Sequence, residues 1–255
     1  MSLAQNMELV RRRIQQACER AGRPTASVTL IAVTKGIPIE TIQEAVALGL
    51  TELGENRVQE AQQKQDVLGS RFKARGKSLS LEPRTSNLEP IRWHLIGHLQ
   101  RNKVKQAVRL FDVLHSVDSL ELIDEFEKAQ GSRLKACGGI GDAPLPMFIQ
   151  VNVSGETTKF GCTPEEAPLF AQAVRERPHL KLAGLMTIAP FSEDPHVARP
   201  HFRRLRELRD ALAAASNLQP STLNLSMGMS QDFEVAIEEG ADFVRIGTAI
   251  FGPRN

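Results

Sequence analysis

The stretch VTLIAVTKGIPIETIQEAVALG, residues Val28 to Gly49, places one lysine, Lys35, where an apolar run ends. The β-branched and apolar residues from Thr29 to Thr34 predict a buried strand. Pro38 then begins and Gly49 ends a segment of helical period. A strand followed directly by a helix is the repeating unit of a parallel α/β sheet, so this stretch predicts an α/β fold.

The same strand-helix unit recurs along the chain. Its 255 residues match the roughly 250 residues of a single (β/α)8 TIM barrel, although two small domains would also fit. We therefore predict one domain, residues 1–255, with an N-terminal helix from Ala4 to Ala21 covering the flank of the barrel. The eight predicted strands are Thr29–Thr34, Glu52–Gly54, Trp93–Ile96, Val113–Ser116, Met147–Val153, Leu182–Thr187, Thr222–Leu225 and Phe243–Ile246.

Capping signals place the ends of several helices. A Ser, Thr or Asp at a helix start pairs with a Glu three residues later in a capping box, and Gly commonly follows the last turn. Two segments rich in Gly, Ser, Pro and basic residues, 69–90 and 131–146, interrupt the repeat and predict mobile surface loops. The predicted helix ends are Thr163 with Pro164 and Glu166, Asp118 with Glu121 and a stop at Gly131, and Ser230 with a stop at Gly240.

Composition excludes several classes of protein. A hydrophobic fraction of 41%, a charged fraction of 24% and a net charge of +2 are typical of a globular protein without a nucleic-acid partner. The basic residues 11–13 fall in an amphipathic pattern, which predicts a solvated helix face. No apolar run reaches a membrane span and no secretory signal opens the chain, so we expect a cytoplasmic location. Cys18, Cys137 and Cys162 are widely spaced and predict reduced thiols.

The histidines do not predict a metal site. His94 and His98 are four residues apart, but Gly97 ends a strand between them, which disfavours the helical ligand geometry. No third ligand follows at a recognisable spacing.

Lys35 allows two interpretations from its position alone. It follows Ile31 and Val33 on one face of its strand, at the carboxyl end, where barrel active sites lie. A structural lysine would extend to solvent or pair with a carboxylate such as Glu55. A functional lysine would be a desolvated amine that adds to an aldehyde and forms a Schiff base.

The last two strand ends favour the functional interpretation. The segments LNLSMGMSQDFEVAIEEG and FVRIGTAIFG follow the seventh and eighth strands, where barrels commonly build a phosphate site. Ser226 and Thr248 offer hydroxyl groups, and Gly228 and Gly247 let the backbone approach an anion closely. Together with Lys35, these loops predict a ligand that carries an aldehyde at one end and a phosphate at the other.

Seven motifs carry a resemblance to a known family. LIAVTK, LGENRVQE, WHLIGHLQRNK, VNVSGETTKFG, GLMTIAP, LSMGMSQDFEVAIEEG and VRIGTAIFG closely resemble the pyridoxal phosphate homeostasis proteins, in the order and at the spacing of that family. The resemblance covers nearly the whole chain. It implies a barrel of the alanine racemase type, PLP fold type III, that holds pyridoxal 5'-phosphate (PLP) as an internal aldimine on Lys35.

The resemblance also implies roles for further residues. Arg245 matches the arginine that faces the pyridine nitrogen in the related racemases, and its fixed charge disfavours a protonated ring. The 69–90 loop is longer than the family leads us to expect. The implied cofactor-binding residues are Lys35, Asn56, Ser226, Met227, Gly228, Arg245, Gly247 and Thr248, with His94 and Lys159 as wall residues near the mouth.

Composition favours a carrier over an enzyme. The related two-base racemases need a tyrosine opposite the lysine, and this chain contains none. We therefore expect no catalytic residues and a monomeric protein that stores, buffers or delivers PLP, with PLP-dependent apoenzymes as candidate partners. The first alternative is a weak PLP-dependent racemase or lyase, with His98 or Cys162 as second base. The second is an aldolase-like barrel that forms a Schiff base with a sugar phosphate.

Overall fold

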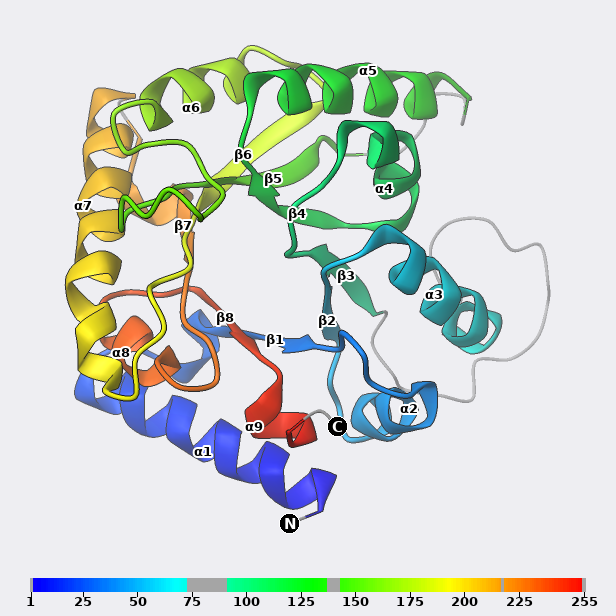
Figure 1. Ribbon diagram of the computed structural model, residues 1–255, viewed down its shortest axis with the longest axis vertical. Helices are drawn as coiled ribbons and strands as arrows, with labels where there is room; N and C mark the ends of the chain where they lie inside the picture. The colour runs from blue at the N-terminus through cyan, green and yellow to red at the C-terminus, as the bar shows by residue number, and fades with distance from the viewer. Residues whose placement is uncertain (1, 73–90, 137–142, 217, 254–255) are drawn as a thin grey trace.

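Eight parallel strands close into one barrel, and helices surround it (Figure 1). The structure is a computed structural model that describes residues 2–72, 91–136, 143–216 and 218–253. Neighbouring strands pair in chain order, and β1 closes the barrel on β8. The predicted (β/α)8 TIM barrel is therefore confirmed. The strands are β1 (Thr29–Val33), β2 (Glu52–Glu55), β3 (Arg92–Leu95), β4 (Val113–Val117), β5 (Leu145–Gln150), β6 (Leu180–Met186), β7 (Asn224–Ser226) and β8 (Phe243–Ile246).

Strand positions agree closely with the predictions, and β8 has the predicted bounds. The largest difference is at β5, which we predicted to run to Val153 and which ends at Gln150. Beyond that point the Val151 amide still donates to the Met186 carbonyl oxygen of β6 at 2.8 Å, but Val151 also forms an isolated bridge with Cys162 of the following loop. The chain therefore stays extended past the strand but leaves the sheet, which a hydrophobic pattern alone cannot distinguish.

The N-terminal helix covers the flank of the barrel beside α8 and α9, as predicted (Figure 1). Its buried face includes Met7, Val10 and Ile14. Arg13, predicted to face water, instead forms an ion pair with Glu234 at 2.7 Å. The helices are α1 (Leu3–Arg20), α2 (Ile39–Ala47), α3 (Val58–Phe72), α4 (Val104–Leu110), α5 (Leu120–Ala136), α6 (Ala167–Arg175), α7 (Arg199–Ala215), α8 (Phe233–Glu238) and α9 (Thr248–Phe251).

The hydrogen bonds of the predicted capping box form between Thr163 and Glu166, but α6 begins at Ala167 rather than at Pro164, and the cap predicted for α5 does not form. The Glu166 carboxylate accepts a hydrogen bond from the Thr163 amide at 2.8 Å, and Thr163 Oγ1 accepts one from the Glu166 amide at 3.3 Å. At α5 the prediction of Asp118 as cap is wrong. Ser119 Oγ accepts the hydrogen bond from the Leu122 amide, because the Asp118 side chain bonds to His98 instead.

Two predicted boundary residues have other roles. Gly131 does not end α5, which continues to Ala136; a Cβ atom at Gly131 would lie 3.0 Å from the His179 ring, so this glycine permits close packing. Ser230 does not begin α8, which starts at Phe233. Gly240, with φ of +98°, follows the end of α8 as predicted.

The two predicted loops are shorter than expected where the structure describes them. Helix α3 continues to Phe72, and the remainder of the first loop, residues 73–90, lies outside the described residues. Helix α5 and strand β5 extend into the second, of which residues 137–142, including Cys137, also lie outside. Among the described helices, none has the length and apolar character needed to cross a membrane. Within the same residues, no three His, Cys, Asp or Glu side chains are arranged to bind a metal ion.

Candidate functional site

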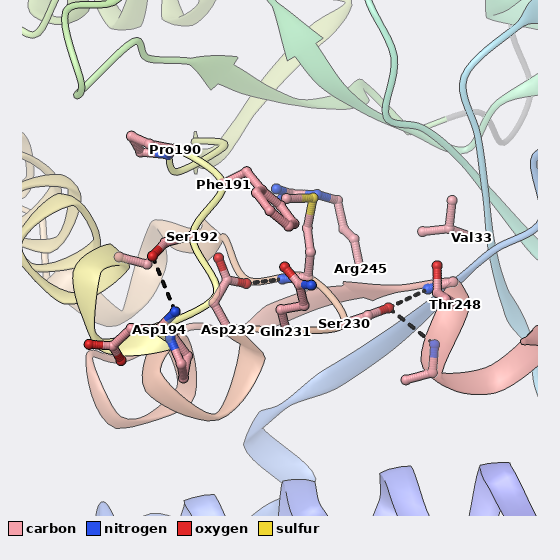
Figure 2. A pocket seen from close by; sticks show the side chains of 15 residues that line it. Val33, Pro190, Phe191, Ser192, Asp194, Ser230, Gln231, Asp232, Arg245 and Thr248 are labelled. Atoms are coloured by element: carbon pink, nitrogen blue, oxygen red, sulfur yellow. Dashed lines mark hydrogen bonds between the residues drawn. The ribbon is translucent and has the colours of Figure 1, made fainter. Parts of the chain in front are cut away.

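A cavity of about 560 Å³ lies at the carboxyl ends of β1, β6, β7 and β8 (Figure 2). Five segments supply its wall: Val33 of β1, the loop after β6, the loop after β7, Arg245 of β8 and the start of α9. In Figure 2, Arg245 lies between Phe191 on one side and Val33 and Thr248 on the other. The cavity thus occupies the end of the barrel where sites of this fold lie.

One side of the cavity offers several hydrogen-bond donors. Ser230 Oγ accepts hydrogen bonds from the amides of Gly247 and Ala249, both at 3.3 Å, which brings the β7–α8 and β8–α9 loops together (Figure 2). Thr248 also lines this side. A Cβ atom at Gly247 would lie 3.3 Å from Val33 Cβ, so a glycine here lets the loop pack tightly on β1. Convergent amides and hydroxyl groups can bind a phosphate.

Arg245 supplies a buried cation to the cavity wall. Its guanidinium donates to Ser226 Oγ at 2.7 Å and to the Thr187 carbonyl oxygen at 2.8 Å. Burial lowers the pKa of Arg245 to about 10, with the Asp232 carboxylate opposing the shift. The group remains charged at neutral pH.

The predicted phosphate loop is divided between the cavity wall and the layer behind it. Gly247 and Thr248 line the cavity, as does Arg245. Ser226, Met227 and Gly228 do not line it. Ser226 and Met227 are fully buried. Gly228 has φ of +93°, and a Cβ atom there would lie 2.6 Å from Ala236 Cβ, so this residue makes the turn that packs on α8.

Lys35 lies two residues beyond Val33, the residue of β1 that lines the cavity, and is itself half-buried outside the lining. No hydrogen bond or ion pair joins its side chain to any residue that the structure describes. The alternative pairing with Glu55 is wrong: Glu55 Oε1 instead accepts hydrogen bonds from Thr34 Oγ1 at 2.6 Å and Lys64 Nζ at 2.5 Å. The amine of Lys35 is thus unpaired with the described side chains at a strand end beside the cavity.

A buried cluster holds the backbone on both sides of Lys35. Lys64 Nζ donates to the carboxylates of Glu55 and Glu60 and to the Thr34 carbonyl oxygen at 2.6 Å. Glu60 also accepts a hydrogen bond from the Gly36 amide at 2.6 Å. Burial raises the pKa of Glu55, although the Lys64 cation opposes it. We call Thr34, Gly36, Glu55, Glu60 and Lys64 the Lys64 cluster.

Asn56, predicted to bind the cofactor, and the predicted wall residues His94 and Lys159 do not line the cavity. Asn56 is half-buried after β2, and its backbone packs so closely on Gly97 that a Cβ atom there would lie 2.6 Å from the Asn56 carbonyl oxygen. His94 is fully buried inside the barrel. Lys159 donates to the Ala189 carbonyl oxygen at 3.2 Å and pairs with Glu156.

The two residues considered as second bases differ in environment. His98 Nδ1 bonds to Asp118 Oδ2 at 2.7 Å, its ring stacks on Phe160, and its side chain is 37% exposed. Cys162 is buried, and burial raises the pKa of its thiol to about 12. A thiol with that pKa stays protonated at neutral pH, so Cys162 is not a base there.

The sequence did not single out Ser230 or the Lys64 cluster. Ser230 is two residues after Gly228 and just before a helix, a position that predicted a helix cap rather than a loop bridge. Glu60 and Lys64 are spaced for an ordinary pair on a helix surface. Nothing in that spacing distinguishes a buried lysine from an exposed one.

Comparison with known proteins identifies the family. The family model of the alanine racemase N-terminal domain matches residues 5–255. A pyridoxal phosphate homeostasis protein of Aquifex aeolicus is 42% identical over 254 residues, which cover 100% of this chain and 99% of the relative. The chain belongs to the pyridoxal phosphate homeostasis protein family. The predicted resemblance is thereby confirmed.

Further members and solved structures agree with this assignment. The pyridoxal phosphate homeostasis protein of Pseudomonas aeruginosa is 41% identical and covers 100% of this chain and 96% of its own length. PipY of Synechococcus elongatus, solved with PLP bound, has a TM-score of 0.74 at 30% identity and covers 98% of this chain and 100% of its own. An alanine racemase of Clostridium difficile shares the fold, with a TM-score of 0.68 at 12% identity, over 99% of this chain and 56% of the racemase.

Proposed function

We propose that this protein binds PLP and serves intracellular PLP homeostasis by storing, buffering or delivering the cofactor. The observation that carries the proposal is one cavity whose wall holds convergent phosphate-binding donors and the Arg245 guanidinium, beside the unpaired amine of Lys35. A related protein, PipY, has been solved with PLP bound.

The residues present fit PLP in their chemistry. The hydroxyl groups of Ser230 and Thr248 suit a phosphate dianion, because hydroxyl groups donate to its oxygens. The amides of Gly247 and Ala249 donate to Ser230 Oγ, which leaves the Ser230 proton for such a ligand. Ser226, Met227 and Gly228, predicted as direct contacts, support this loop from behind. Arg245 suits the ring nitrogen, since a guanidinium disfavours its protonation. When bound, PLP supplies an electron sink, and an unprotonated ring weakens that sink.

Lys35 is the residue to which we assign covalent attachment. Its amine would hold the cofactor by condensing with the aldehyde, with release of one water molecule. The Lys64 cluster holds the peptide groups before and after Lys35 and so limits the motion of the strand end. Positioning of this kind favours the addition because less freedom is lost when the bond forms.

Absorption spectroscopy with borohydride reduction tests the proposal. We expect the purified protein with PLP to show a visible band that borohydride removes, with the reduced adduct on the peptide containing Lys35. Lys35→Ala should lose both the band and the adduct. Lys128→Ala, at a surface lysine that is 73% exposed, is the matched control and should keep both. An adduct on another lysine, or a band that survives in Lys35→Ala, would overturn the assignment.

The enzymatic alternative has one supporting observation, the pairing of His98 with Asp118 at the end of the barrel that carries the cavity. A carboxylate that orients an imidazole favours its action as a base. Incubation of the PLP-loaded protein with single amino-acid enantiomers would measure turnover by loss of chirality. Sustained turnover that His98→Ala abolishes would replace the carrier function with a racemase or lyase activity.

A further inference from the structure

A continuous chain of hydrogen bonds crosses the interior of the barrel and ends at Arg245. Arg245 donates to Ser226 Oγ at 2.7 Å, and Ser226 Oγ lies 2.8 Å from His115 Nδ1. His115 Nε2 lies 2.9 Å from His94 Nδ1, and His94 Nε2 lies 2.5 Å from Glu52 Oε2. The five side chains come from β8, β7, β4, β3 and β2.

The middle of this chain is sealed from water. Ser226, His94 and His115 are fully buried. The His115 ring stacks on Phe148, with ring centres 4.4 Å apart, and meets the edge of Phe243 at 5.7 Å. Each polar atom here must therefore satisfy its hydrogen bonds within the chain, because an unpaired buried group is costly.

Counting protons gives the chain a direction. A guanidinium only donates, so Ser226 Oγ accepts from Arg245 and must place its own proton on His115 Nδ1. A neutral His115 then carries its proton on Nε2 and donates to His94 Nδ1. His94 in turn carries its proton on Nε2 and donates to Glu52. Every bond thus points from the cation to the carboxylate.

The electrostatics agree with this direction. Burial lowers the pKa of His115 well below its usual value, and the cations of Arg245 and Arg92 lower it further, which favours the neutral ring. Burial is the largest single influence on Glu52 and opposes its ionisation, but the contacts with His94 and with Arg92, at 3.5 Å, together outweigh burial and lower the pKa of Glu52. The chain therefore joins a cation and an anion through neutral groups.

We propose that this directed chain fixes the orientation and charge of Arg245, and that Ser226, His115 and His94 are positioning residues for the pyridine end of bound PLP. The identity of the ligand in this inference rests on the proposed function, whereas the direction of the hydrogen bonds does not. Arg245 has no carboxylate among its described hydrogen-bond partners. The Asp232 carboxylate favours its charge without a hydrogen bond to it, and Glu52 is the carboxylate at the far end of the hydrogen-bonded chain. Two anchored N–H groups leave the remaining donors of the guanidinium free for a ligand.

The first test uses the protein without PLP. Nitrogen-15 NMR of labelled histidines reports which ring nitrogen carries the proton. We expect a proton on Nε2 alone in both His115 and His94, and Ser226→Ala should alter the His115 signals. A proton on His115 Nδ1, or a doubly protonated His94 at neutral pH, would overturn the direction of the chain.

The second test measures the cofactor end. Ser226→Ala should weaken PLP binding about tenfold, because a hydrogen bond to a charged group is lost. Glu52→Gln keeps the shape but removes the charge, and should shift the pH midpoint of the visible band of bound PLP. Glu127→Gln is the control. It removes a carboxylate from a comparable pair, Glu127 with His179 at 2.6 Å, which is not part of the chain of hydrogen bonds, and it should change neither the PLP affinity nor the pH midpoint.

The two tests separate the inference from the function on which it rests. If the wild-type protein binds no PLP, the proposed function fails while the NMR result still decides the direction of the chain. If PLP binds but Glu52→Gln behaves as Glu127→Gln does, the positioning role is overturned and the proposed function stands.

Discussion

At the scale of single residues, Ser230 joins the two loops that we assign to the phosphate. Its hydroxyl accepts hydrogen bonds from the amides of Gly247 and Ala249, so the three groups form one surface. A side chain in this place can contact a ligand and also hold the amides that contact it. Its loss should therefore affect phosphate recognition more than aldehyde chemistry.

We predict that Ser230→Ala weakens PLP binding about tenfold, the loss expected for a hydrogen bond to a charged oxygen. Binding of pyridoxal, which lacks the phosphate, should not change. Fluorescence titration with both ligands measures this. Ser192→Ala is the control, because Ser192 also lines the cavity but accepts a hydrogen bond from the Asp194 amide. An equal loss for both ligands would contradict the assignment.

The residue scale also shows what a sequence can predict. Lys35 stood out because a charged residue ended an apolar strand, and the structure places it at that strand end. Ser226 and Ser230 are chemically identical and four residues apart, yet one is buried behind the cavity and the other lines it. Only the path of the loop, set by the turn at Gly228, determines which serine faces the cavity.

At the scale of elements, the Lys64 cluster connects α3 to the ends of β1 and β2. Glu55 is fully buried, and Lys64 is the cation that compensates it. Removing one partner of a buried ion pair leaves an uncompensated charge. The cluster thus links the stability of the barrel to the position of Lys35.

We predict that Lys64→Met lowers the free energy of unfolding by about 3–5 kcal/mol at neutral pH. Burial raises the pKa of Glu55 in the folded state, so its contribution favours folding below the unfolded pKa and is lost as pH rises through the folded one. The defect of Lys64→Met should therefore shrink at acidic pH. Urea denaturation at several pH values measures this.

The double variant Glu55→Gln with Lys64→Met is the control for that prediction. It removes both charges, so its stability should exceed that of Lys64→Met at neutral pH and should lack the pH-dependent defect. A double variant no more stable than Lys64→Met at neutral pH would show that lost packing, rather than an unpaired carboxylate, causes the effect.

A second element-scale prediction concerns the pairing of β6 with β7. Gly184 has φ of +155°, and a Cβ atom there would lie 1.9 Å from the Asn224 carbonyl oxygen. Gly184→Ala should therefore lower the free energy of unfolding by about 3 kcal/mol or more, because the strands must separate. Gly155 is the matched control: its φ is +73°, and apart from its chain neighbours no described residue has an atom within 4 Å of where a Cβ atom would lie. Gly155→Ala should cost only about 1 kcal/mol in thermal denaturation.

The elements themselves were largely predictable from the sequence. The order of the barrel strands was predicted because short apolar, β-branched runs alternate with longer segments of helical period. Helix ends were harder. Gly131 lies inside α5 because the His179 ring approaches it, a contact between residues 48 positions apart that no local pattern contains.

At the scale of the whole molecule, ligand binding should stabilise the fold by mass action. A ligand at one hundred times its dissociation constant adds about 2.7 kcal/mol. We predict that PLP at this excess raises Tm by about 5–10 °C for a chain of this size. At the same PLP concentration, the Tm of Lys35→Ala should rise less, because this variant keeps only the non-covalent contacts with PLP. An equal gain in both proteins in thermal denaturation would show that covalent attachment adds nothing to affinity.

The pairing of β1 with β8 sets the order in which the protein can become competent during synthesis. Lys35 is made before β8 and before the cavity residues that follow it, Gly247 to Ala249. A nascent chain that ends before β8 contains Lys35 but lacks the loop that we assign to the phosphate. PLP binding should therefore report closure of the barrel. In a series of ribosome-stalled nascent chains of increasing length, we expect PLP binding only in chains long enough for β8 to have left the ribosome.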